Sequence, residues 1–120
     1  MARERFVLLG LARARSLWFR EVARWATSAA IPAEFVKCVS AEELRSHLVS
    51  DRAFSAAILD GGLPAVDRDL IQAARDAGCP VVVIDDRRQA RDWRSLGAAA
   101  VLPAELDRAQ LLDALATHAQ

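Results

Sequence analysis

Short runs of apolar residues alternate with amphipathic stretches along the whole chain. Five apolar runs have the length of strands: residues 5–12, 34–40, 54–60, 79–86 and 98–103. Five other stretches carry apolar residues at every third or fourth position, as helices do: residues 17–30, the segment after Ser40, and residues 67–78, 88–97 and 108–119. We therefore expect one domain over residues 1–120, built from five strand–helix units.

Several helix ends carry side chains that can cap them. Ser40 and Glu43 have the spacing of a capping box, in which each side chain accepts a hydrogen bond from the other residue's backbone amide. Asp67 is a candidate N-cap of the third helix, and Gly78 lies just past the end of that helix. Pro32 is expected to stop the first helix. These signals support the division into helices and strands.

The strict alternation of strands and helices indicates a parallel sheet, because each parallel connection requires a crossover. We expect a doubly wound α/β fold with five helices on the two faces of a five-stranded sheet, in the order 2-1-3-4-5. Ligands of such sheets bind beyond the carboxyl ends of the strands, at the switch between strands 1 and 3. Asp60 ends the third strand and so occupies the usual functional position.

Composition narrows the function classes without identifying one. The 16 basic residues balance the 16 acidic ones, so no global charge favours binding to nucleic acid or to an anionic membrane. No apolar run approaches the length of a membrane span. Cys38 and Cys79 are far apart in the sequence and lie in or beside apolar stretches, which is typical of free thiols in a reducing compartment. We therefore expect a cytoplasmic protein. The sequence lacks a Ser-His-Asp pattern, a glycine-rich phosphate loop and zinc-ligand spacing, so we expect neither an enzyme nor a bound cofactor.

The segment AILDGGLPAVDRDLI, residues 57–71, resembles the region around the phosphoacceptor aspartate of bacterial response-regulator receiver domains. Asp60, Leu63, Pro64 and Asp67 match the spacing of that family's aspartate, Leu or Met, proline and acidic residue. The segments AGCPVVVIDD and LGAAAVLP resemble the family's fourth and fifth strands. The resemblance covers nearly the whole chain and implies the flavodoxin-like fold and a role in two-component signal transduction.

The family's catalytic residues are missing at the matching positions. Receivers use a magnesium ion to neutralise the repulsion between the phosphoryl oxygens and the carboxylate. Gly10, Leu11 and Ala12 stand where the family has its acidic pair, and Asp85 stands where it has a small hydroxyl residue. The lysine is absent from the segment Leu102, Pro103, Ala104 and Glu105, and Val101 stands at the aromatic switch position. The resemblance thus implies a non-catalytic pseudo-receiver. The alternatives are a receiver phosphorylated on Asp60 and a small ligand-binding domain, which the lack of a phosphate-cradling loop disfavours.

Asp60 itself has two interpretations. It is either the polar end of a buried strand, bonded by turn amides, or a vestigial phosphoacceptor with a regulatory role. Arg13 or Arg15, in the loop after the first strand, would then supply the positive charge that the metal ion normally provides. The alternative is that both arginines are solvated loop residues.

Asp85 and Asp86 form a second candidate group with Asp60, because the three carboxylates end neighbouring strands. Such a group could bind a divalent cation. The more ordinary interpretation is that two carboxylates precede a basic helix and stabilise its N-terminus. We therefore predict no metal site.

The resemblance also implies a working surface, since receivers usually read out their state on the face of helix 4, strand 5 and helix 5. We expect a protein partner, an attached effector domain or a weak homodimer to bind there. The residues of this face are Arg91, Trp93, Arg94, Asp107, Arg108 and Asp113, with Trp93 as the anchor if its ring is exposed. Helix 1, with Leu17 and Arg24, is the rival surface. Pseudo-receivers occur ahead of MinD/ParA-type ATPases and of DNA-binding effectors, so the resemblance implies such an effector. Because the net charge is zero, we expect this domain itself to contact neither nucleic acid nor a membrane.

Overall fold

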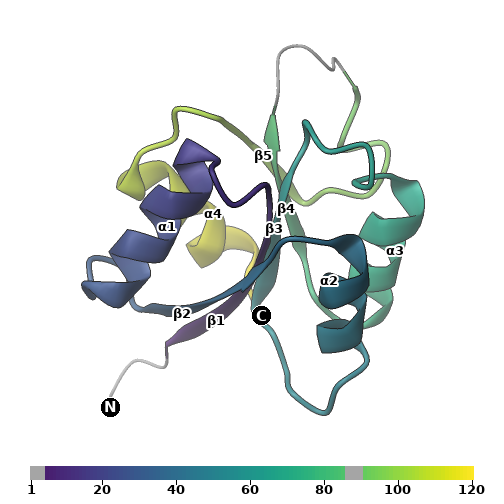
Figure 1. The fold of residues 1–120 in the computed structure, drawn as a ribbon, viewed down its shortest axis with the longest axis horizontal. Helices are drawn as coiled ribbons and strands as arrows, with labels where there is room; N and C mark the ends of the chain where they lie inside the picture. Colours follow the sequence, from purple (N-terminus) through teal and green to yellow (C-terminus); the bar gives the residue numbers. More distant parts are fainter. Residues whose placement is uncertain (1–4, 86–90) are drawn as a thin grey trace.

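Five parallel strands form the centre of the computed structural model, which describes residues 5–85 and 91–120 (Figure 1). The strands are β1 (Phe6–Leu11), β2 (Ala33–Cys38), β3 (Ala56–Asp60), β4 (Val81–Asp85) and β5 (Ala100–Pro103). Their order across the sheet is β2-β1-β3-β4-β5, and every neighbouring pair is parallel. The predicted doubly wound α/β topology is therefore confirmed.

Helices cover both faces of this sheet. They are α1 (Leu17–Thr27), α2 (Ala41–Leu48), α3 (Arg68–Asp76) and α4 (Arg108–His118). Helices α1 and α4 lie on one face, and α2 and α3 lie on the other (Figure 1). Successive strand residues point to opposite faces, so Leu8 and Ile58 pack beneath α1 and α4, whereas Leu9 and Leu59 pack beneath α2 and α3. Among the described residues, no helix has both the length and the apolar character that crossing a membrane requires.

The helix predicted over residues 88–97 is wrong for the part that the structure describes. Residues 93–97 form successive turns, and residues 88–90 lie outside the described residues. Asp92 accepts hydrogen bonds from the Ser95 amide at 3.2 Å and from the Ser95 hydroxyl, as a helix N-cap would, but the chain turns at Gly97 before a helix forms. Gly97 has a φ of +112°, which no helix contains. Within residues 5–85 and 91–120 the sheet is therefore flanked by four helices and not by the expected five.

The predicted caps are largely present. Asp67 accepts a hydrogen bond from the Leu70 amide at 2.9 Å, and Gly78 follows α3 with a φ of +76°. Ser40 accepts from the Glu43 amide at 3.1 Å, but the Glu43 carboxylate accepts from the amide of Val39, one residue earlier than a capping box requires.

Two other helix ends were not anticipated in this form. A complete capping box joins Asp107 and Gln110 at the start of α4. Helix α1 ends at Thr27, well before Pro32, and Ala29 then takes a left-handed φ of 62°. The chain thus leaves α1 through a conformation that usually falls to glycine.

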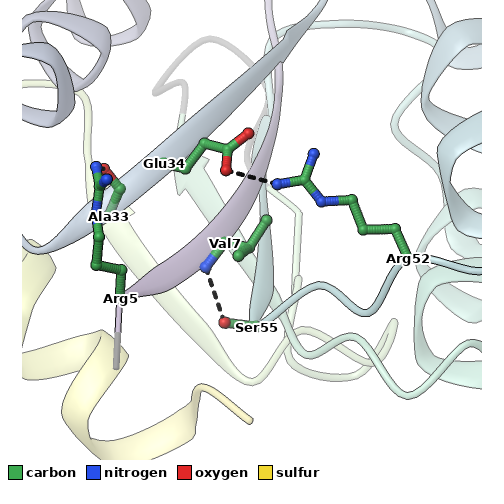
Figure 2. A network of polar contacts seen from close by, with 6 residues as sticks. All are labelled: Arg5, Val7, Ala33, Glu34, Arg52 and Ser55. Atoms are coloured by element: carbon green, nitrogen blue, oxygen red, sulfur yellow. Dashed lines mark hydrogen bonds and ion pairs between the residues drawn. The ribbon is translucent and has the colours of Figure 1, made fainter. Parts of the chain in front are cut away.

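A polar network ties the amino-terminal edge of the sheet together (Figure 2). The Val7 amide donates to the Ser55 hydroxyl at 2.9 Å, and the Ser55 amide donates to the Val7 carbonyl at 2.7 Å. Arg52 forms an ion pair with Glu34 of β2, with an N···O distance of 2.6 Å. These contacts connect β1, β2 and the segment before β3, and they satisfy the buried Ser55.

Candidate functional site

The Asp60 carboxylate lies at the carboxyl end of β3, and both of its oxygens have protein donors. Oδ1 accepts a hydrogen bond from the Gly62 amide at 2.8 Å. Oδ2 accepts from the indole Nε1 of Trp18, in the first turn of α1, at 3.4 Å. Asp60 is partly exposed, whereas Trp18 is only 5% exposed. The side of the carboxylate that faces α1 is thus covered by an aromatic ring.

Aromatic packing explains why Trp18 reaches this position. Gly10 of β1 has no side chain, and a Cβ there would lie 2.1 Å from Cζ of Phe35. The Phe35 ring fills that space and packs edge-on against Phe19, with ring centroids 5.5 Å apart. Phe19 in turn meets Trp18 edge-on, with centroids 5.6 Å apart. This chain of three rings fixes the first turn of α1 above β1 and aims the Trp18 indole at Asp60.

The positions that match the family's acidic pair hold no metal ligand. Leu11 and Ala12 are buried, and Leu11 pairs in register with Leu59, so Ala12 lies level with Asp60. Magnesium requires several oxygen ligands in a near-octahedral arrangement, and apolar side chains supply none. No group of three or more His, Cys, Asp or Glu side chains that could hold a metal ion occurs among residues 5–85 and 91–120.

The neighbouring strands place two further carboxylates at the same edge of the sheet. Asp85 ends β4 opposite Pro103, and it lines a cavity of about 130 Å³ together with Pro103, Ala104 and Glu105. This cavity lies where the family's lysine would stand, and it contains acidic groups instead. Asp86 lies outside the described residues, so the three-carboxylate group with Asp60 stays a prediction. Val101 is half-buried against the α3 side of the sheet.

The expected arginine partner of Asp60 is not present in the structure. Arg13 and Arg15 are exposed, and within the described part of the chain neither forms an ion pair. The structure thus agrees with the alternative of two solvated loop arginines, and a turn amide, that of Gly62, bonds the carboxylate as the first interpretation of Asp60 expects. The Trp18 indole lies beside the carboxylate instead, because its ring is buried against Phe19 and directs its single N–H toward Asp60. In the sequence, Trp18 is one of the regularly spaced apolar residues of the segment 17–30, and its spacing gives no sign of a contact with Asp60.

Trp93 is a core residue and not a surface anchor. It is 2% exposed and packs with Leu59, Val66 and Leu70 beneath the α2–α3 face. Gly61 makes room for it, since a Cβ at Gly61 would lie 3.0 Å from the Trp93 ring and 2.8 Å from the Ile84 carbonyl oxygen.

The other residues of the expected interaction face are partly engaged within the chain. The Arg91 guanidinium lies 4.9 Å above the Trp93 ring and donates to the Val66 carbonyl at 3.4 Å. Arg94 donates to the Ala99 carbonyl at 3.2 Å, and Asp107 caps α4. Arg108 and Asp113 are exposed on α4. The described part of this face therefore lacks the exposed aromatic centre that a binding hot spot would use.

Comparison with known proteins identifies the fold and leaves the family open. Neither a protein-family model nor a curated protein sequence matches the chain. Solved structures of receiver domains do match. A response regulator receiver protein from Pseudomonas putida is 24% identical, with a TM-score of 0.70 over 98% of this chain and 99% of its own.

Two further receiver structures are similar at lower identity. The signal receiver domain of NarL from Mycobacterium tuberculosis is 21% identical, with a TM-score of 0.67 over 96% of both chains. A CheY-like receiver domain protein from Methanospirillum hungatei is 18% identical, with a TM-score of 0.66 over 93% of both chains. At these identities the likeness establishes a flavodoxin-like receiver fold.

Proposed function

We propose that this protein is a pseudo-receiver, a non-catalytic regulatory module that acts through contacts with other proteins. The observation that supports this proposal most directly is the environment of Asp60. One oxygen of the carboxylate accepts a hydrogen bond from the Gly62 amide, and the other accepts one from the Trp18 indole. The residues that lie level with Asp60 at the end of β1, Leu11 and Ala12, are apolar. The receiver fold is retained around a carboxylate that serves the structure.

This environment opposes phosphoryl transfer for an electrostatic reason. A carboxylate that attacks a phosphoryl group approaches three negatively charged oxygens, and a divalent cation normally neutralises that repulsion. An indole N–H is a neutral donor that offers only one hydrogen bond. Leu11 and Ala12 supply no ligands with which to hold a cation beside Asp60. The barrier to transfer is therefore expected to stay high even with a reactive phosphodonor.

Intact-mass analysis after incubation with acetyl phosphate and magnesium tests the proposal. We expect no phosphoryl adduct on the wild-type chain. A phosphoryl adduct that disappears in Asp60→Asn would overturn the proposal in favour of a phosphorylatable receiver. That alternative draws its support from the partial exposure of Asp60 at the carboxyl edge of the sheet. Asp67→Asn, which keeps a cap acceptor at α3, serves as the control for nonspecific modification.

We assign the protein contact to the outer surface of α1. Leu17 is 81% exposed there and, with Arg20, Glu21 and Arg24, lines a crevice of about 410 Å³. An exposed leucine among arginines combines apolar area with charge, as binding surfaces do. The burial of Trp93 removes the main argument for the competing face.

Sedimentation separates the two surfaces. Self-association, or binding of an attached effector such as a MinD/ParA-type ATPase or a DNA-binding domain, should weaken in Leu17→Asp. It should persist in Arg94→Glu. The reverse result would return the contact to the face of β5 and α4.

A further inference from the structure

A cavity of about 430 Å³ lies at the amino-terminal edge of the sheet, at the opposite end of β4 from Asp85. The C-terminal end of α3, the start of β4 and the segment that leads into β5 form its walls. The side chains of Arg75, Arg94 and Gln120 line it, together with Cys79 and Gly97. Among residues 5–85 and 91–120, no aspartate or glutamate side chain lines it.

The Arg75 side chain packs against the backbone of Gly97 at the wall of this cavity. A Cβ at Gly97 would lie 2.9 Å from Nη1 of Arg75 and 3.1 Å from its Cδ, so the arginine rests against the bare backbone of Gly97. Gly97 also has a φ of +112°, which favours glycine for a second reason. Within residues 5–85 and 91–120, the Arg75 guanidinium forms neither an ion pair nor a hydrogen bond. Its donors are therefore available to a ligand.

Arg94 approaches the same cavity from the segment before β5. One of its nitrogens donates to the Ala99 carbonyl at 3.2 Å, which orients the guanidinium and leaves its other donors unused. The amides that line the cavity are engaged already: the Cys79 amide donates to Ala74 at 2.9 Å, and the Ala99 amide donates to Val81 at 2.8 Å. Two guanidinium groups are thus the main donors that the cavity offers.

We propose that this cavity binds a small molecule through a carboxylate or phosphate group held by Arg75 and Arg94. The planar fork of a guanidinium matches the oxygens of either group, and two such forks leave a positive charge that Asp92, which interacts electrostatically with Arg94, offsets only in part. The volume falls within the range of small-ligand sites. Buried Cys79, Val81 and Ala98 give the cavity an apolar floor for the rest of the molecule.

The nearby end of α3 does not cancel this attraction. The C-terminal end of a helix carries partial negative charge on its free carbonyls. Here the carbonyls of Ala73, Ala74 and Arg75 accept hydrogen bonds from the amides that follow the helix. The charge of the two guanidinium groups therefore dominates the cavity. This site is separate from Asp60, which lies at the carboxyl ends of the strands, whereas the cavity lies at their amino-terminal ends.

Titration of the 15N-labelled chain with inorganic phosphate, and separately with succinate, tests the proposal at constant ionic strength. We expect saturable shifts of the Gly78, Gly97 and Ala99 amides with at least one of the two anions. Arg75→Gln and Arg94→Gln should each weaken binding about 10-fold or more, because each removes a charge-assisted contact. Arg68→Gln removes one charge from the other end of α3 and should leave binding unchanged.

The two anions distinguish the source of the oxygens. Saturation by phosphate alone identifies a phosphorylated ligand, and saturation by succinate alone identifies a carboxylate. The proposal is overturned if neither anion saturates these amides, or if Arg68→Gln weakens binding as much as the two cavity variants do. All three substitutions replace exposed side chains, so circular dichroism is expected to show an unchanged fold.

Discussion

The hydrogen bond between Trp18 and Asp60 can be measured by a double-mutant cycle. Trp18→Phe removes the indole N–H together with part of a buried ring, and Asp60→Ala removes the carboxylate together with its bond to Gly62. Each single change therefore mixes several effects. The cycle cancels those that the two changes do not share and leaves the interaction between the two side chains.

The expected coupling follows from the geometry of the contact. Hydrogen bonds to charged groups contribute about 1.5–3 kcal/mol when they are short and well shielded. The donor–acceptor distance here is 3.4 Å, longer than the usual 2.7–3.2 Å range, and Asp60 is partly exposed to water. We therefore expect a coupling of about 0.5–1 kcal/mol. In a chain of this size it corresponds to a change in Tm of roughly 2–6 °C.

Urea unfolding of the wild type, both single variants and the double variant gives the coupling directly. Trp25→Phe provides a matched control, because Trp25 is half-buried on the same helix and, within the described residues, its indole forms no hydrogen bond with Asp60. Its cycle with Asp60→Ala should give no coupling. A Trp18–Asp60 coupling below about 0.3 kcal/mol, the usual error of additivity, would refute the view that the indole holds the carboxylate.

Three further outcomes follow from the structure. Burial raises the pKa of the Cys38 thiol to about 11 and that of the Cys79 thiol to about 12. Both thiols should therefore react with a chromogenic thiol reagent near pH 8 only after denaturant is added, which the absorbance of the released product measures. Ala29→Gly should stabilise the protein by up to ~1 kcal/mol in urea unfolding, because Ala29 has a φ of 62°, whereas the same change at Ala73 inside α3 should destabilise it. The hydrogen bond from Arg52 lowers the pKa of Glu34 below 4.5, so its stabilising effect is present above that pH and is lost as the pH falls through the lowered pKa. Arg52→Gln should therefore flatten the acid side of a plot of Tm against pH, and an unchanged plot would contradict this assignment.

The strand order and the place of Asp60 could be predicted because they depend on patterns that are local in the sequence. The strand β4 begins with an uninterrupted apolar run, which is typical of a strand buried on both faces of a parallel sheet. Asp67 and Gly78 mark the ends of α3 through their own backbone chemistry. The end of a strand then fixes which residue stands at the carboxyl edge.

The partner of Asp60 and the turns around Trp93 could not be predicted in the same way. Trp18 and Asp60 are 42 positions apart, and their contact depends on the direction of one ring above the sheet. Residues 91–97 have a helical spacing of apolar side chains, yet the burial of Trp93 and the conformation of Gly97 outweigh that preference. Side-chain direction and tertiary burial are properties of the assembled fold.

The two edge strands determine how this protein can meet another one. An open strand edge can pair with a strand of a second chain, and proteins oppose this with charged residues, prolines and short edge strands. At one edge, β5 has four residues and ends at Pro103, which has no N–H to donate. At the other, β2 exposes Glu34 and Lys37, and the Ala33 carbonyl already accepts a hydrogen bond from Arg5 at 2.8 Å. Growth of the sheet from chain to chain, the usual route to β-aggregation, is thus disfavoured at both ends, and association is directed to the helices and loops.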